Sequence, residues 1–290
     1  MTTQNQPQKQ LVNVKTGEPY QPVRIYYQVF KNKKKTVLSA LQKLKCIEYE
    51  PERDRWNWLY EAEAKKLRFT RSYGALTAAD KPLILGYFTF RGEEQMLLDL
   101  RSFERATHAI DFFDKRINRY AATPTHMRIV NRLFSLEDMP NREIHPSLDP
   151  FFNRENVPCL AHQMEQQFEQ IEAEHADDPE GKEKALQAYL DQHMNQPHPE
   201  IEELIIHPDK IDRLGLPMAL QMRQVEAFEH WRGNFTFRAT DVIQQWVEAM
   251  ADEFDDEFDD EFDDEVVEEI TEAEAEATQK EASQSDRSDS

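Results

Sequence analysis

The spacing of hydrophobic positions changes twice between residues 82 and 120, and this predicts two strands followed by a helix. Residues 83–90 (LILGYFTF) form the longest apolar run, of a length and aromatic content typical of a strand. In residues 95–101 the apolar side chains recur mostly at every second position, which predicts a second strand. The intervening residues 91–94 (RGEE) predict a turn. We therefore expect a β-hairpin at the centre of the fold.

A helix is expected directly after this hairpin. Ser102 can cap its start, and Pro124 predicts its end. Asp111 and Lys115 lie four residues apart on its flank and can form an ion pair. Its apolar stripe, with spacings of three and four residues, consists of Phe103, Ala106, Ile110, Phe113, Ile117 and Tyr120. A stripe of this length predicts a helix that packs against the sheet.

Further strands are predicted upstream of the hairpin. Residues 23–30 alternate, residues 46–50 and 55–60 flank a turn, and residues 66–73 predict a weaker strand. Thr36 can cap a short helix after the first of them. The order of these elements predicts an α+β fold, an antiparallel sheet with helices on one face.

Composition divides the chain into five predicted regions. They are a disordered N-terminal extension (1–20), a basic α+β module (21–135), a Pro-rich linker (136–159), an acidic and mainly helical region (160–251) and a disordered acidic-aromatic tail (252–290). In the helical region, Asp178 followed by Pro179 predicts a helix start and a helical hairpin. Residues 201–207 are compatible with either a strand or a helix.

Charge is distributed unevenly along the 290 residues, whose net charge is −21. Residues 1–135 carry 24 Lys and Arg against 14 Asp and Glu. Residues 136–251 carry 9 against 23, and residues 252–290 carry 2 against 19. A basic front and an acidic rear predict electrostatic interactions, either with partners or between the two ends of the chain.

The tail is the most unusual stretch, because residues 252–276 hold 16 acids and no base. Three copies of one tetrapeptide place Phe254, Phe258 and Phe262 four residues apart. Self-repulsion predicts disorder in the free state, and the phenylalanines favour folding on a basic, partly apolar surface. That surface could belong to a partner protein or to the chain's own module. A purely solubilising tail is the alternative, and a calcium loop is disfavoured because the glycine turn is missing.

Two basic clusters are candidate binding sites for an anion, a nucleic acid or the tail. Lys31, Lys33, Lys34 and Lys35 precede a helix start, where cations oppose the helix dipole and an anionic partner would offset them. A solvated charged turn is the alternative interpretation. The second cluster consists of Arg53, Arg55, Trp56, Trp58, Lys65, Lys66, Arg68 and Arg71.

Trp56, Trp58 and Tyr60 share one face of a predicted strand. If that face is exposed, it forms a stacking platform for single-stranded nucleic acid. If it is covered, the same three residues belong to the core, which is the commoner arrangement for such a stripe.

The sequence contains no motif for catalysis, a cofactor or a metal. The glycines form neither a dinucleotide-binding nor a phosphate-binding loop, and no catalytic residue can be chosen. Two cysteines suit a reducing compartment, and neither a secretory signal nor an apolar run of membrane-spanning length is seen. We therefore expect a cytoplasmic protein without cofactor, metal or membrane partner.

Three functions remain open. We expect a non-enzymatic binding or regulatory protein, an adaptor or assembly factor whose tail contacts a basic partner or its own module. A single-stranded nucleic-acid (RNA) binding protein with a competing tail is the first alternative, and an unrecognised enzyme is the second.

Overall fold

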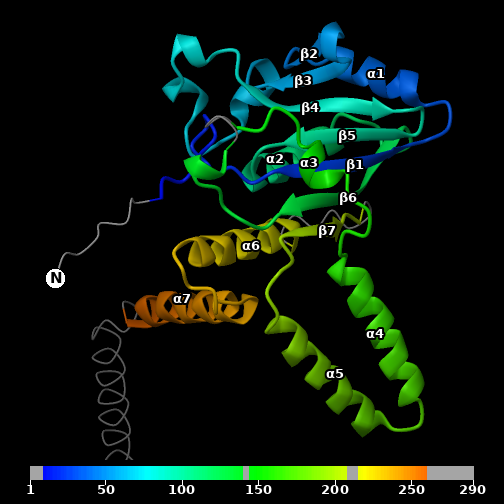
Figure 1. The fold of residues 1–290 in the computed structure, drawn as a ribbon, viewed down its shortest axis with the longest axis vertical. Helices are drawn as coiled ribbons and strands as arrows, with labels where there is room; N and C mark the ends of the chain where they lie inside the picture. Colours follow the sequence, from blue (N-terminus) through cyan, green and yellow to red (C-terminus); the bar gives the residue numbers. More distant parts are fainter. Residues whose placement is uncertain (1–8, 140–143, 208–214, 260–290) are drawn as a thin grey trace, which may run out of the picture. The chain divides into compact units, whose positions relative to one another are not determined.

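The computed structural model describes residues 9–139, 144–207 and 215–259, with side chains described up to residue 249, and these form an α+β fold (Figure 1). The described strands make one antiparallel sheet in the order β2-β3-β4-β5-β1-β6-β7. The strands are β1 (Val23–Val29), β2 (Ile47–Glu50), β3 (Arg55–Leu59), β4 (Ile84–Arg91), β5 (Gln95–Leu100), β6 (Ala122–Val130) and β7 (Ile201–Ile205). The helices are α1 (Lys34–Gln42), α2 (Phe103–Asp114), α3 (Asp149–Phe152), α4 (Leu160–Glu174), α5 (Pro179–Met194), α6 (Gly215–Trp231) and α7 (Ala239–Asp259).

The predicted hairpin is confirmed at the centre of the sheet. Strands β4 and β5 pair from Gly86 opposite Leu100 to Arg91 opposite Gln95. Strand β1 then lies between β5 and β6, although it comes first along the chain. The ambiguous stretch that begins at residue 201 is a strand, β7, which pairs with β6 at the sheet edge.

One face of the sheet, the inner face, is covered by α1 and α2. Side chains from both helices and from the inner face of the strands form the main hydrophobic core, which also includes Leu220 of α6. The Trp58 ring lies 5.4 Å from the ring of Phe112 and 5.0 Å from that of Phe113. The residues predicted to form a buried stripe on α2 therefore supply much of the core, with one exception.

The exception is Tyr120, which is 85% exposed. Helix α2 starts as predicted, with Ser102 Oγ accepting a hydrogen bond from Arg105 N at 3.2 Å, but it ends at Asp114. Pro124, expected to stop the helix, instead lies inside β6, at the point where the register with β1 shifts. A proline lacks the N–H that a regular strand pair uses, so a register shift suits it.

The described part of the N-terminal segment, residues 9–20, packs into the fold, so the disorder predicted for residues 1–20 is wrong for this part. Val12, Val14 and Tyr20 are buried in a second hydrophobic core. Leu11 forms a β-bridge with Ser135, and the prediction for residues 1–8 lies outside the described residues.

The described part of the predicted linker 136–159 also contributes to this second core. Leu148, Phe151 and Phe152 are buried there, and α3 lies on the outer face of the sheet. The Pro-rich stretch is therefore packed against the module.

The contacts of the chain define one compact unit that ends at Ala239 and a second that begins at Thr240.

Three smaller predictions need correction or completion. Helix α1 begins at Lys34 with Lys33 in the capping position, so Thr36 lies inside it. Residues 66–73 form no strand: a 3-10 helix, η2 (Ala62–Lys66), and a loop replace it. The predicted helical hairpin is present as α4 and α5, and Asp178 Oδ1 accepts a hydrogen bond from Gly181 N at 3.0 Å. None of the helices in the described ranges is long and apolar enough to cross a membrane.

Candidate anion-binding groove

A surface groove of about 530 Å³ lies between α1 and the turn that joins α2 to β6. Both walls come from elements that the main core holds in place, since Val37 and Leu41 of α1 and Ile117 of the turn are buried. The residues that line it are Lys35, Thr36, Val37, Ser39, Ala40, Lys43, Leu44, Arg116, Ile117, Asn118 and Ala121. None of these is acidic, so the groove offers cations and neutral hydrogen-bonding groups.

The cations of the groove come from both walls. Ser39 and Lys43 follow Lys35 at intervals of four residues, which places the three side chains on one face of α1. Arg116 faces them from the turn, where its NH1 atom donates to Phe112 O at 2.7 Å and its guanidinium lies 3.6 Å from the centre of the Phe112 ring. These contacts hold Arg116 in place, and its charge has no carboxylate partner among the described residues.

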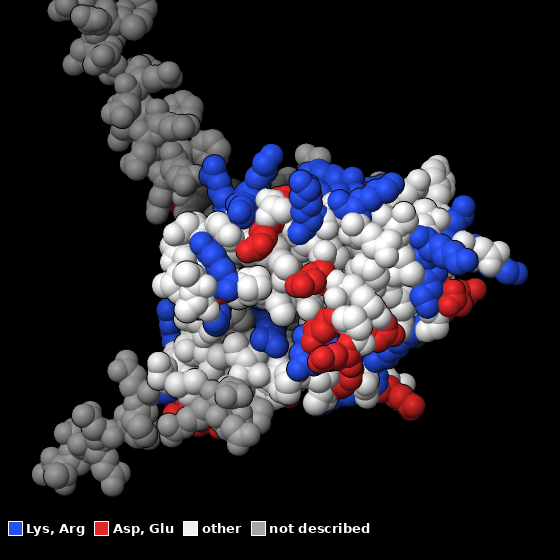
Figure 2. Space-filling view, turned by 90° about the horizontal axis from the view of Figure 1, so that it is seen from above, with Lys and Arg blue, Asp and Glu red and all other residues white. Residues whose placement is uncertain are grey.

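Further lysines surround the groove. In the described part of the chain, Lys31, Lys33 and Lys45 form no ion pair, whereas Lys34 Nζ donates to Gly92 O at 2.9 Å and to Glu93 Oε1 at 3.1 Å. Figure 2 looks onto the end of the sheet where α1 and β2 lie, and Lys and Arg side chains gather around its margin. The first predicted basic cluster is thus a largely unpaired positive surface.

The fold brings part of the second basic cluster to the same end. Glu63 in η2 accepts hydrogen bonds from Lys45 N at 3.2 Å and from Cys46 N at 3.0 Å, directly after α1. Lys65 and Lys66 follow Glu63 in the same 3-10 helix and are exposed. The turn after α1 and η2 therefore form one continuous basic region.

The remaining members of the second cluster lie elsewhere or are neutralised. Arg53 and Arg55 both pair with Glu50, at 3.2 and 2.6 Å. Arg68 and Arg71 are exposed, but their backbones bond to α2 and to the N-terminal segment: His108 Nε2 lies 2.8 Å from Arg68 O, and Arg71 N donates to Thr16 O. These four arginines are separate from the groove.

Trp56 and Trp58 belong to the core, which corrects the idea of a stacking platform. Trp58 is fully buried, Trp56 is 9% exposed and Tyr60 is fully buried. Strand β3 presents them to the face that α2 covers, so no base can stack on them. The covered alternative is the correct interpretation of this stripe.

The tail predictions fall largely outside the described residues. The backbone of α7 is helical through Asp259 and so includes Phe254 and Phe258, whose side chains are not described. Phe262 and the rest of the tail lie outside the described residues. The role of the three phenylalanines stays a prediction.

Two groove residues, Lys43 and Arg116, are absent from the sequence-based candidates. The four-residue spacing from Lys35 through Ser39 to Lys43 is a signal that could have identified Lys43. Arg116 has no such signal, because it reaches the groove only through the packing of α2 against the sheet.

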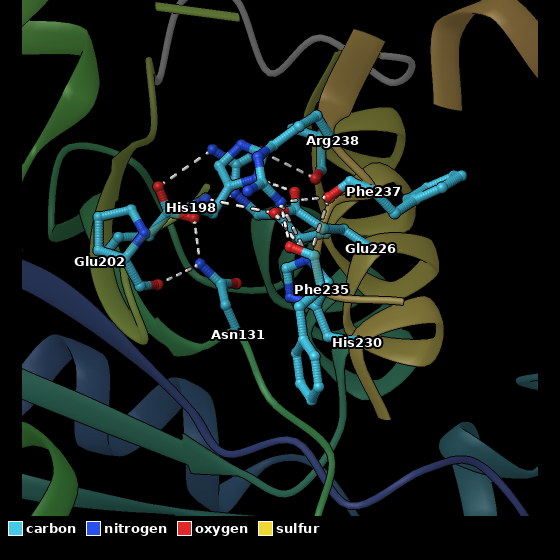
Figure 3. A network of polar contacts seen from close by, with 11 residues as sticks. Asn131, His198, Glu202, Glu226, His230, Phe235, Phe237 and Arg238 are labelled. Atoms are coloured by element: carbon cyan, nitrogen blue, oxygen red, sulfur yellow. Dashed lines mark hydrogen bonds and ion pairs between the residues drawn. The ribbon is translucent and has the colours of Figure 1, made fainter. Parts of the chain in front are cut away.

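A second polar cluster joins α6 to the edge of the sheet (Figure 3). Glu226, 3% exposed, accepts a short hydrogen bond from His198 Nδ1, and His230 Nε2 lies 3.7 Å from its other oxygen. Burial alone would raise the pKa of Glu226, but the hydrogen bond and charge of His198 hold this pKa below its ordinary value. The cluster binds α6 to the segment that precedes β7.

Beside it, Glu202 of β7 is fully buried and is bonded by Arg223 of α6 and by Asn131 Nδ2, the latter at 2.6 Å (Figure 3). The Nε2 atom of His230 lies 3.0 Å from Phe237 O, so the loop after α6 folds back on the helix. Each charged group named in this cluster has a protein partner among the described residues. We therefore assign it a structural role.

Among the described residues, no group of three His, Cys, Asp or Glu side chains could hold a metal ion. The basic groove remains the site with the clearest unsatisfied charge. Comparison with known proteins adds no relative: no protein-family model, no curated protein and no solved structure matches the chain.

Proposed function

We propose that this chain is a non-catalytic binding protein whose groove, lined by Lys35, Lys43 and Arg116, takes an acidic polypeptide. The observation that supports this is the absence of any carboxylate among the groove residues, in a molecule whose net charge is −21. Three cations that lack a carboxylate on a partly apolar surface suit a ligand that combines acids with apolar side chains.

The chain itself contains a segment of that chemistry. Residues 252–276 hold 16 acids and no base, with phenylalanines at every fourth position of the repeats. The apolar lining residues Val37, Leu44 and Ile117 offer contacts for an aromatic ring beside the cations. Tethering raises the effective concentration of the tail, so it would compete with an acidic segment of a partner protein and regulate its binding.

A labelled peptide of residues 252–276 tests the proposal by fluorescence anisotropy. The chain that lacks residues 252–290 should bind it more tightly than the full chain, because the tethered competitor is gone. Lys35→Glu/Lys43→Glu should weaken binding at least tenfold. The affinity should fall as salt is added, since exposed charges are screened.

Lys182→Glu/Lys184→Glu is the matched control. It makes the same charge change on α5, at the far end of the molecule from α1 in Figure 1. If both double substitutions weaken peptide binding equally, the effect comes from net charge alone and the proposal is contradicted. Identical amide chemical shifts of α1 in the full and the truncated chain at low salt would exclude the tethered contact.

Single-stranded nucleic acid is the second candidate ligand, and one observation favours it. Tyr120, 85% exposed, lies between the groove residues Asn118 and Ala121 and could stack on a base beside the lysines. A labelled oligonucleotide that binds more tightly than the acidic peptide, and that loses affinity in Tyr120→Ala, would favour this candidate. If the peptide binds more tightly, the acidic-polypeptide proposal stands.

A further inference from the structure

A small cavity lies on the outer face of the sheet, opposite α1 and α2. Strands β3, β4 and β5 form its floor, and Leu148, which is buried beside α3, closes one side. Its volume is about 70 Å³. Since one water needs about 10–15 Å³ of such space, the cavity has room for a small group the size of a few waters.

Arg101 lines this cavity, and its side chain has no partner among the described residues. Within the described ranges, its side chain forms no ion pair and no hydrogen bond, although it is only partly exposed. The other arginines of this face are all paired, as Arg24 with Asp99, Arg91 with Asp149 and Arg128 with Glu203 show. A half-buried guanidinium loses hydration, so a lone one is costly unless an anion meets it.

The one carboxylate in the cavity wall, Asp99, does not supply that anion. Its two oxygens accept hydrogen bonds from Arg24, at 2.6 Å from Nε and 2.8 Å from NH2. Tyr87 lies directly across from Asp99 in the sheet and is partly buried. Its burial, and to a lesser extent the nearby charge of Asp99, raise the pKa of the Tyr87 hydroxyl. The charge of Asp99 is therefore already balanced, and the Tyr87 hydroxyl stays protonated.

Arg55 supplies a second set of donors from the opposite wall. Its Nε donates to Glu50 Oε2 at 2.6 Å, and its guanidinium lies 4.7 Å from the centre of the Tyr87 ring. These contacts fix the guanidinium plane. Its two terminal nitrogens form no hydrogen bond to the described residues, so they remain able to donate.

We propose that Arg101 and Arg55 together hold a small tetrahedral oxyanion of the phosphate class in this cavity. Two guanidinium groups present planar donor pairs that match phosphate oxygens. A phosphate group is small enough for a cavity of this volume. Ile84, 38% exposed, marks the open side, through which the rest of a phosphate ester would extend into solvent. This site is independent of the groove and of its proposed function.

Isothermal titration calorimetry of the full chain with inorganic phosphate, at constant ionic strength, tests the site. One phosphate should bind per chain, and Arg101→Gln should weaken binding at least tenfold. Arg101→Lys keeps the charge but loses the paired donors, so it should weaken binding several-fold, and it serves if the glutamine variant does not fold. A parallel titration with methyl phosphate distinguishes the two sources: equal or tighter binding indicates an ester, weaker binding free phosphate.

Arg68→Gln is the matched control, because Arg68 is an exposed arginine away from the cavity. It should leave phosphate binding unchanged. If Arg101→Gln and Arg68→Gln weaken binding equally, or if phosphate does not bind, the proposal is overturned. Failure of the groove experiment would not affect this result.

Discussion

Arg105 and Glu18 form an ion pair inside the protein: each side chain is 2% exposed, and Arg105 Nε lies 2.8 Å from Glu18 Oε1. Thr16 and Ser102 complete the network, since both hydroxyls donate to the same Glu18 oxygen, at 2.7 and 3.0 Å. Arg105 also donates to Leu85 O at 3.0 Å in β4. The pair therefore fastens the N-terminal segment to the start of α2 and to the sheet.

Arg105→Met should destabilise the fold by about 3–5 kcal/mol, because it leaves the Glu18 carboxylate buried without its cation. Replacing both residues, in Glu18→Met/Arg105→Met, removes the buried charge together with its partner. The double variant should therefore be more stable than Arg105→Met alone. Urea unfolding followed by tryptophan fluorescence measures both. Additive losses in the double variant would show that the two side chains do not depend on each other.

The carboxylate of Glu226 should make the stability depend on pH in the acid range. Its folded-state pKa is lowered, so the unfolded chain takes up the proton first as pH falls, near the ordinary Glu pKa of about 4.3. Its contribution is present above that value and is lost as pH falls through the folded pKa. Between pH 5.5 and 3.5, wild type should therefore lose more stability than Glu226→Gln.

Urea midpoints at several pH values measure this difference. Glu229→Gln removes an equal charge from the same helix, where Glu229 pairs with the largely exposed Arg232, and it should follow wild type. The charged groups that face Glu226 are His198, before β7, and His230, on its own helix. Parallel curves for wild type and Glu226→Gln would mean that the His198 contact does not favour the charged carboxylate.

The two cysteines should differ in their reactivity toward thiol reagents. Cys46 is fully buried, and burial, together with the nearby Glu63 carboxylate, raises its pKa to about 12. Because the thiolate is the reactive form, Cys46 should not react in the folded protein at pH 8. Cys159, partly exposed beside the start of α4, should react.

A colorimetric disulfide reagent should therefore detect one thiol per folded chain and two in urea. Cys159→Ser should reduce the folded count to zero, whereas Cys46→Ser should leave it at one. Rapid reaction of both thiols in the folded state would contradict the packing around Cys46.

The sequence predicts α2 well at its start and poorly at its end, and the reason is local. Ser102 and the first four stripe positions carry both a capping side chain and a helical period, and they lie as expected. The helix ends at Asp114, but Ile117 in the following turn happens to keep the apolar spacing of the helix. Since hydrophobic period reports burial and not backbone conformation, the boundary could only come from the packed structure.

For the groove, sequence predicts the charges but not their arrangement. The cluster of lysines before α1 can be seen in the sequence. The alternation along β3 does not distinguish a buried from an exposed Trp58. Which face of β3 is covered depends on where α2 packs, which no local pattern encodes. The same packing brings Arg116 opposite Lys35 and so forms the groove.

Gly181, on the first turn of α5, should resist a substitution that is usually favourable. Gly→Ala inside a helix normally stabilises by about 1 kcal/mol, but a Cβ at Gly181 would clash with Asp178 Oδ2. The Asp178 cap would have to move and would lose its bond to Gly181 N, which costs about 1 kcal/mol. The two effects should nearly cancel in Gly181→Ala.

In an Asp178→Ala background the clash with the carboxylate is absent and only a 3.0 Å contact with His175 Nδ1 remains, so Gly181→Ala should regain most of its stabilising effect there. Amide hydrogen exchange of α5 measures each step of this cycle, because it reports the local opening of that helix. Asp178→Ala alone should raise the exchange rate about fivefold, and adding Gly181→Ala should lower it again by a similar factor. An equal effect of Gly181→Ala in both backgrounds would show that the Cβ does not reach the Asp178 carboxylate.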